Sequence, residues 1–132
     1  MARPLAARLR RRERITTEAD YRRVFQDGRR LDGRWFVLVA LSNGRSWSRL
    51  GLAASRRLGG AVVRNRARRR LRELFRRWKP AAEALDIVLV PKRELITCGE
   101  PELEREYRER LRRLASPSSL AQRRSARRAG AD

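Results

Sequence analysis

Apolar residues recur at two different spacings along the chain, and each spacing predicts its own kind of element. Helical spacing occurs within residues 17–28, 55–79 and 101–114. Short runs rich in apolar and β-branched residues, typical of strands, occupy residues 34–41, 50–54 and 86–91, and residues 29–33 fit a short edge strand or turn. The order α-β-β-β-α-β-α predicts an α+β fold in a single small domain, with about four strands in a mixed sheet and three helices.

Capping and helix-breaking residues mark the ends of the predicted elements. Thr17 begins the first helix in a Thr-Glu-Ala-Asp sequence that resembles a capping box, and Gly28 can end it. Pro80 ends the second helix because proline cannot continue one, and Pro101 opens the third. Asn43-Gly44 is typical of a turn, so we expect the strands on either side of it to pair as a hairpin.

The second helix is apolar on one side and cationic on the other. Its apolar side must face a core, and consists of Val63, Ala67, Leu71, Leu74, Phe75 and Trp78. Its other side holds Asn65 among Arg66, Arg69, Arg72 and Arg76. Glu73 is the only acid between Ser55 and Lys79, and like charges four residues apart repel unless a ligand neutralises them. The helix is therefore predicted to bind a polyanion.

The overall charge supports the same prediction. The chain carries 35 lysines and arginines against 15 acids, a net charge of +20, so the free protein repels itself. Nearly all of this charge is arginine, whose planar guanidinium group binds phosphate through two donors. Nucleic acid is the leading partner. A membrane surface is the weaker alternative because the longest apolar run, residues 35–41, is too short to span a bilayer.

The distribution of charge also predicts the domain organisation. Residues 1–14 are basic and lack core-forming periodicity, so we expect a flexible arm that either follows a phosphate backbone or only increases solubility. Residues 15–115 form the single folded domain, which is all that a chain of this length supports. Residues 116–132 are polar, small and basic, which predicts a disordered basic tail.

Two residue types that build sites in other proteins are scarce here. The chain has one cysteine, Cys98, and no histidine, which excludes an internal disulfide and the usual zinc clusters. This composition suits a reducing compartment, and we expect a cytoplasmic protein. The basic N-terminus lacks the apolar segment of a secretory signal.

The stretch around the start of the second helix resembles a known family, the bacterial ribonuclease P protein component. In that family a strand ends in Ser and two basic residues, and a Gly-Asn-Ala-Val turn leads into an Arg-Asn-Arg helix. Here the signature is matched by residues 55–66, followed by Arg68, Arg69, Leu71 and Arg72. Gly60 departs from it, since the family usually has Asn there, and Arg56 and Arg57 replace common lysines without loss of charge.

The resemblance extends over roughly residues 14–114 and implies a fold. That fold is like ribosomal protein S5 domain 2, with a left-handed βαβ crossover. Most βαβ units are right-handed, so this expectation comes from the resemblance alone.

The resemblance also implies two groups of binding residues. The catalytic RNA of the family would be bound by Arg64, Asn65, Arg66, Arg68, Arg69 and Arg72. The 5' leader of precursor tRNA would be guided by Tyr21, Phe25, Ser55, Arg56 and Arg57. By spacing alone, an aromatic pair four residues apart is more often core than ligand platform. In the family, however, a similar Asp-Phe-x-x-Val-Phe segment lines a cleft for single-stranded RNA, and a tyrosine keeps the stacking face.

Small residues in the strand predicted at residues 50–54 are also interpreted as part of the leader site. Gly51, Ala53 and Ala54 leave space beside the backbone, and under the resemblance the RNA leader would approach there.

No catalytic group is predicted in the protein itself. Without histidine, and with acids that alternate around the last helix, the chain offers no persuasive acid–base pair or metal cluster. The resemblance implies an accessory subunit of an endoribonuclease, in which an RNA removes the leader from precursor tRNA. The cofactor would be Mg2+, held mainly by the RNA. The implied partners are ribonuclease P RNA and precursor tRNA, with no membrane and no DNA expected.

Other functions of a basic helix stay open at this point. A ribosomal or general RNA-binding structural protein would have a similar composition. Such a protein has no need of the aromatic pair or the small-residue strand, whereas a leader channel needs both. A DNA-binding helix is weaker because arginine dominates the exposed face and offers little discrimination between bases.

Overall fold

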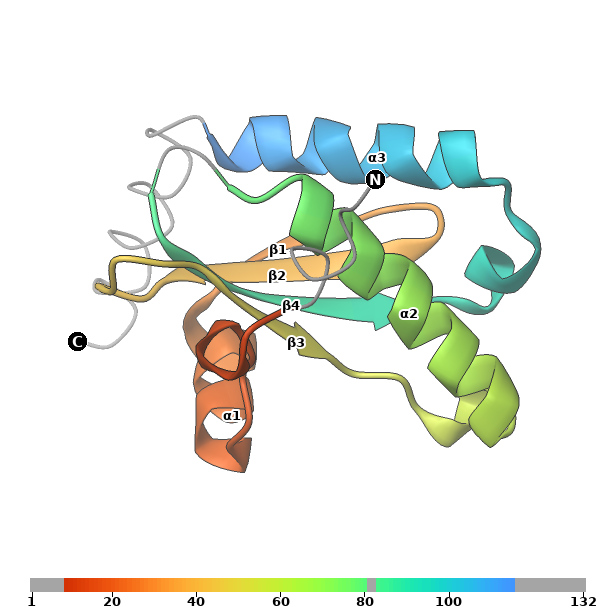
Figure 1. Cartoon of the computed structure of the whole chain (residues 1–132), viewed down its shortest axis with the longest axis horizontal. Coiled ribbons are helices and arrows are strands. Elements are labelled where there is room, and N and C mark those ends of the chain that lie inside the picture. Colours follow the sequence, from red (N-terminus) through yellow and green to blue (C-terminus); the bar gives the residue numbers. More distant parts are fainter. Residues whose placement is uncertain (1–8, 81–82, 116–132) are drawn as a thin grey trace.

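The computed structural model describes residues 9–80 and 83–115. The main elements are α1 (Glu18–Asp27), β1 (Arg29–Asp32), β2 (Phe36–Ser42), β3 (Arg49–Leu52), α2 (Ala61–Arg77), β4 (Leu85–Pro91) and α3 (Glu100–Leu114) (Figure 1). Short 3-10 turns are η2 (Arg11–Glu13), η3 (Arg56–Leu58) and η4 (Arg93–Thr97). The predicted α-β-β-β-α-β-α order and the α+β class with a four-stranded mixed sheet are confirmed.

The sheet has the strand order β1-β2-β4-β3. β2 pairs antiparallel with both β1 and β4, whereas β3 pairs parallel with β4. The predicted hairpin is therefore wrong, because β4 lies between the two strands that flank the Asn43-Gly44 turn. The physical reason is burial: residues 85–89 of β4 are buried, and a central position gives both edges of this strand a partner.

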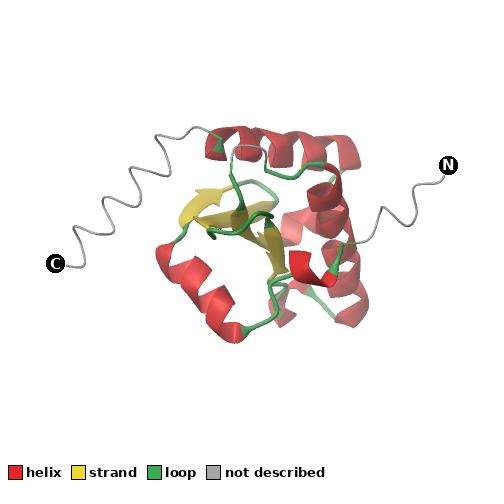
Figure 2. Ribbon diagram, turned by 60° about the vertical axis from the view of Figure 1, so that its left-hand side comes forward, coloured by secondary structure: helices red, strands yellow, loops and turns green. Residues whose placement is uncertain are grey.

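Side chains of the strands alternate between two cores of unequal size. Phe36, Leu38 and Ala40 of β2 face the larger core, which is covered by α2 and α3. Val37 and Val39 face the smaller core, which is covered by α1. Figure 2 shows the helices on both sides of the sheet. The sheet is thus a layer with one face fully covered by two helices and the other covered by a single short helix.

The three predicted helices are confirmed, although α2 ends at Arg77, before the predicted stop at Pro80. Thr17 caps α1, its Oγ1 accepting a 3.1 Å hydrogen bond from the Asp20 amide, and Gly28 follows its last residue. The predicted apolar side of α2 is confirmed: Ala67, Leu71, Leu74 and Phe75 are buried, and Val63 and Trp78 pack partly buried against the same core.

The start of the folded unit differs from the prediction. Residues 9–14 were expected in a flexible arm, but Leu9 is 5% exposed in the larger core and Arg14 forms a parallel bridge with Leu50 of β3. The Ile15 amide also donates a 2.9 Å hydrogen bond to the Leu50 carbonyl. The folded unit therefore includes residues 9–14, and the predicted boundary lies too late. The parts of the predicted arm and tail at 1–8 and 116–132 lie outside the described residues.

Two further expectations concern the connections and the surroundings of the fold. The left-handed β3–α2–β4 crossover stays a prediction from the family resemblance. Among the described helices, none combines the length and the apolar character needed to cross a bilayer.

Candidate RNA-binding site

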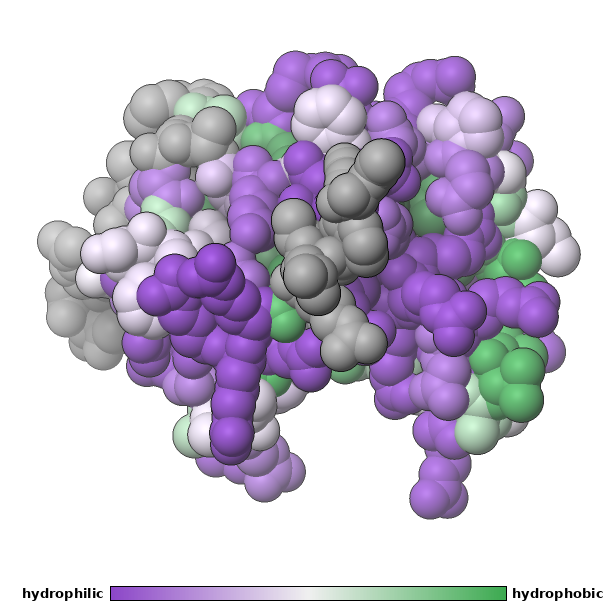
Figure 3. All heavy atoms as spheres, viewed as in Figure 1, coloured by the Kyte–Doolittle hydropathy of each residue, from purple (hydrophilic) through white to green (hydrophobic). Residues whose placement is uncertain are grey.

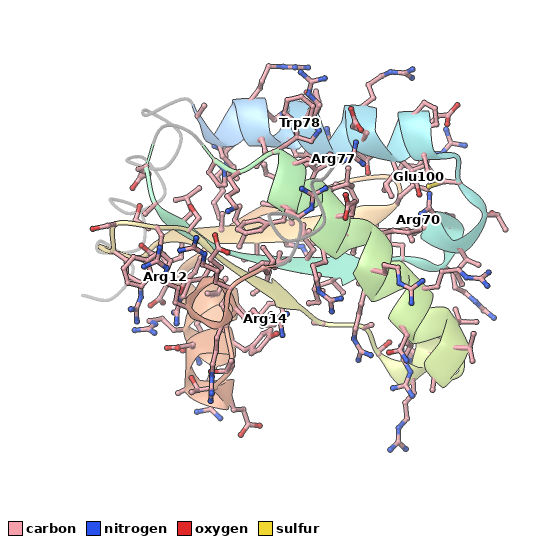
Figure 4. All side chains as sticks on the ribbon, in the orientation of Figure 1. Arg12, Arg14, Arg70, Arg77, Trp78 and Glu100 are labelled. Atoms are coloured by element: carbon pink, nitrogen blue, oxygen red, sulfur yellow. The ribbon has the colours of Figure 1, made fainter. Side chains whose placement is uncertain are left out.

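Salt bridges separate the arginines of α2 into two groups. Where α2 contacts α3, arginines are paired with acids: Arg70 Nε lies 2.8 Å from Glu100 Oε2, and Arg77 Nη1 lies 3.2 Å from Glu104 Oε1. Figure 4 shows Arg70, Arg77 and Glu100 together at this contact. An open pocket of about 630 Å³ between the two helices is lined by these same charges of both signs. This side of α2 is largely neutralised and is a poor site for a polyanion.

Arg76 belongs to this paired group, contrary to its predicted place on the cationic side. Its guanidinium pairs with Glu73 on the same helix, and its side chain is only 14% exposed. The helical spacing was correct, but the expectation that its charge is available to a ligand was wrong.

The other polar residues of α2 are accessible and lack acidic partners. Asn65, Arg66 and Arg69 are exposed, while Arg64, Arg68 and Arg72 are half-buried. None of these arginines forms a salt bridge with an acid in the ranges 9–80 and 83–115. The predicted RNA-binding group is therefore divided by the structure. Arg69 lines the pocket between α2 and α3, and Arg66 lies beside Leu95 and Ile96 of η4. The rest of the predicted group is Arg64, Asn65, Arg68 and Arg72.

Repulsion within this cationic group is visible at Arg72. Burial and then the positive charges of Arg14, Arg68 and Arg69 lower the pKa of Arg72. Guanidinium groups held this close repel one another in the free protein, so a phosphate between them would be stabilised by several charges at once.

Arg14 is a member of the site that the sequence reasoning missed. It precedes α1, and its bridge to β3 brings it beside α2. Figure 4 shows Arg14 between α1 and α2. The neighbouring segment is held by the Trp47 side chain, whose Nε1 donates a 2.8 Å hydrogen bond to the Arg12 carbonyl. No local pattern could have placed Arg14 here, because the placement depends on pairing with a strand far along the chain.

The predicted aromatic pair lies on α1, beside β3. The ring of Tyr21 lies against Gly51, where an added Cβ would be 2.7 Å from Tyr21 Cε1. The Leu52 amide donates a 3.1 Å hydrogen bond to the Tyr21 hydroxyl. Phe25 is 45% exposed. Tyr21 is thus half-buried with a fixed orientation, and Phe25 presents its ring to solvent.

This packing changes the interpretation of the small residues in β3. The space beside Gly51 is filled by Tyr21 and is not open to a ligand. Ala53 and Ala54 follow β3 and are half-buried, so room for a ligand beyond the strand end stays a prediction.

The predicted Ser55, Arg56 and Arg57 lie between β3 and α2, and all three are exposed. After η3 the chain turns at Gly59, whose φ of +148° favours glycine, and α2 begins with no side-chain cap at Gly60. Gly60 thus supplies no side-chain acceptor to the first backbone N–H groups of α2, an arrangement that suits an anion.

α1, which carries the aromatic pair, and α2, which carries the arginines, lie on opposite sides of one hollow. α1 and the first half of α2 both extend to the same edge of the molecule, and the chain from β3 to η3 runs between them (Figure 1). Figure 3 shows the surface hollowed between these two helices. The structure thus brings the aromatic residues, the segment 55–57 and the cationic helix to one side of the molecule.

The described residues were also searched for a cluster of metal-binding side chains. No group of three or more His, Cys, Asp or Glu side chains there could hold a metal ion. The expectation was that the RNA holds most of the Mg2+, and it stays a prediction.

Comparison with known proteins identifies the family. The family model described as Ribonuclease P matches residues 9–115. The ribonuclease P protein component of Thermotoga maritima is 38% identical over 86 residues, covering 64% of this chain and 74% of the relative. A Streptococcus pneumoniae relative of the same name is 33% identical over 93 residues, covering 70% of this chain and 76% of its own.

Solved structures agree with the sequence comparison. The RNase P protein from Thermotoga maritima superposes with a TM-score of 0.69 at 31% identity, covering 76% of this chain and 96% of that one. The Staphylococcus aureus RNase P protein superposes with a TM-score of 0.68 at 28% identity, covering 79% and 95%. The chain therefore belongs to the ribonuclease P protein family, a family of ribonucleoprotein subunits that takes part in an endoribonuclease complex and has RNA as its partner.

Proposed function

We propose that this chain binds the catalytic RNA of ribonuclease P and the 5' leader of precursor tRNA, and so assists removal of the leader. The observation that carries the proposal is the separation of charges on α2. Arg70, Arg76 and Arg77 are paired with acids, whereas the other arginines of α2 form no salt bridge among the described residues. If every arginine of α2 served only to stabilise the fold, acids of this chain should pair with all of them. The arginines without such a partner therefore favour binding of an external polyanion.

The catalytic RNA is assigned to the arginines of α2 that form no salt bridge among the described residues. If Arg64, Arg66, Arg68, Arg69 and Arg72 each neutralise one phosphate, log K should fall with log salt at a slope of about −4. Between 50 and 200 mM salt this slope corresponds to a loss of affinity of about 250-fold. Asn65 accepts a 3.0 Å hydrogen bond from Arg68, which orients that guanidinium on the helix surface.

The leader is assigned to the opposite side of the hollow. Phe25 presents an exposed ring and Tyr21 is held against β3, so a single strand could stack there. Ser55, Arg56 and Arg57 would contact its phosphates where β3 leads into α2. Positive charge between two RNA molecules lowers their repulsion, and the largest effect is therefore expected at low magnesium. The RNA is proposed to hold the magnesium ions and to carry out the hydrolysis.

The proposal is tested by cleavage of labelled precursor tRNA at low magnesium. We would compare the protein alone, a bacterial ribonuclease P RNA alone, and the two together. Cleavage at the mature 5' end only in the mixture is the expected result. Tight binding to any RNA offered, with no gain in cleavage, would favour a ribosomal or general RNA-binding structural protein.

A further inference from the structure

α1 is attached to the sheet by very few apolar contacts. Of its residues, Val24 alone is buried, and it lies among Val37, Val39 and Val88. The ends of the helix are held at Thr17 and Gly28, and on its side Tyr21 packs against Gly51 and accepts a hydrogen bond from the Leu52 amide. A polar contact at the side of the helix can therefore decide which residues face outward.

The strongest such contact comes from a buried arginine of β3. Arg49 is 7% exposed and faces its parallel-strand neighbour Asp86, which is 2% exposed. The two form a bidentate pair, with Nε 2.9 Å from Oδ1 and Nη2 2.6 Å from Oδ2. The remaining nitrogen, Nη1, lies 3.3 Å from Oδ2 of Asp20 on α1. One guanidinium thus joins two strands and a helix.

This contact lies beside the aromatic residues of the proposed leader site. Asp20 immediately precedes Tyr21, whose hydroxyl is bound by the Leu52 amide on the same strand as Arg49. With a helix radius of about 5–6 Å including side chains, a rotation of about 20° would displace a side-chain end by about 2 Å. Such a displacement would move the ring of Phe25 away from a stacked base.

We propose that Arg49 is a positioning residue of the leader site: it holds Asp20 and thereby sets the rotation of α1 that directs Tyr21 and Phe25 toward the leader. The inference rests on the proposed function and adds to it, since Arg49 is buried and contacts no RNA. Its net effect on folding comes mainly from the Asp86 pair, whereas its effect on the leader comes from the Asp20 contact.

The test uses Asp20→Asn in the full chain assembled with a bacterial ribonuclease P RNA. This variant removes one charge from a partly exposed carboxylate and leaves the Arg49–Asp86 pair intact. We expect the affinity for precursor tRNA with a leader to fall about fivefold or more, the lower end of what one base–aromatic stack contributes. Affinity for mature tRNA and for the catalytic RNA should not change. Glu18→Gln, which removes a charge from the same helix, is the matched control and should leave all three affinities unchanged.

A second variant separates the Arg49 contact from the exposed pair that Asp20 also makes with Arg23. Arg49→Lys keeps one charge for Asp86 but cannot bridge both carboxylates with a planar group. It should reproduce the leader-specific loss, and combining it with Asp20→Asn should add nothing further. Additive losses, or equal losses for precursor and mature tRNA, would overturn the proposal.

A Tyr21→Ala holoenzyme distinguishes failure of this inference from failure of the proposed function. Leader preference lost in Tyr21→Ala but kept in Asp20→Asn would refute the role of Arg49 alone. Leader preference unchanged in Tyr21→Ala would refute the leader site itself, and the role of Arg49 with it.

Discussion

Replacing Gly51 by alanine is expected to displace Tyr21. A Cβ at this position would lie 2.7, 2.9 and 3.0 Å from Cε1, Cζ and the hydroxyl oxygen of Tyr21. Non-bonded carbons prefer separations of about 3.5–4.0 Å, so the ring must move. That movement would break the 3.1 Å hydrogen bond from the Leu52 amide.

The structure also sets the size of the effect. Forcing an extra carbon into a packed contact costs about 1–3 kcal/mol, and the lost hydrogen bond adds about 0.5–1.5 kcal/mol. The smaller conformational freedom of alanine in the unfolded chain returns about 0.4–1 kcal/mol. The free energy of unfolding should therefore fall by about 0.5–4 kcal/mol in Gly51→Ala, with a central value of about 2 kcal/mol. With Tyr21 removed the obstruction is gone, and the same change should be neutral or slightly stabilising.

Urea unfolding of a double-mutant cycle measures this coupling. The four proteins are the original chain, Gly51→Ala, Tyr21→Ala and the double variant. The control introduces Gly51→Ala into Tyr21→Phe. Because phenylalanine keeps the ring, Gly51→Ala should still lower the free energy of unfolding in this protein. Effects of Gly51→Ala and Tyr21→Ala that add within about 0.5 kcal/mol would refute the packing of Tyr21 on β3.

Three other predictions follow from the site and its charges. Arg66→Ala should weaken binding of the catalytic RNA and reduce the slope of log K against log salt by about one. The control Arg105→Ala, on the exposed side of α3, should change neither. An unchanged slope in Arg66→Ala would show that Arg66 does not contact a phosphate. Tyr21→Ala should weaken binding of precursor tRNA and spare mature tRNA, whereas equal loss would return Tyr21 to a purely structural role. Desolvation opposes ionisation of Asp20, but the Thr17 hydrogen bond and the charges of Arg49 and Arg23 lower its pKa. The ionised Asp20 therefore stabilises the folded protein fully at pH values above the pKa of an ordinary carboxyl group. This stabilisation is lost as the pH falls through the lowered pKa of Asp20 in the folded protein. Unfolding measured over roughly pH 2 to 6 should therefore show less acid sensitivity in Asp20→Asn.

The separation of paired and unpaired arginines explains how a strongly basic chain can fold. Arg70 donates to the carbonyls of Leu95 and Cys98 at 2.7 and 2.8 Å in addition to its salt bridge with Glu100. Its charge is thereby used to hold η4 against α2. Such arginines stabilise the fold, whereas the arginines of α2 without a salt bridge among the described residues keep an uncompensated charge.

Features that depend on local spacing could be predicted from the sequence. The cap at Thr17, the stop at Gly28 and the apolar side of α2 each follow from residues within one or two helical turns of one another. The cationic side of α2 follows from the same periodicity, and so does the location of the RNA-binding prediction.

Features that depend on contacts between distant segments were decided only by the tertiary structure. The insertion of β4 between β2 and β3 overrode a correct local turn signal, because the most buried strand needs two neighbours. The position of Arg14 beside Arg72 and the neutralisation of Arg76 depend on which segments meet, and no spacing encodes that. The sequence by itself therefore determined the elements and the faces they present, whereas strand pairing and ion pairing decided which charges stay unpaired and which aromatic rings stay exposed.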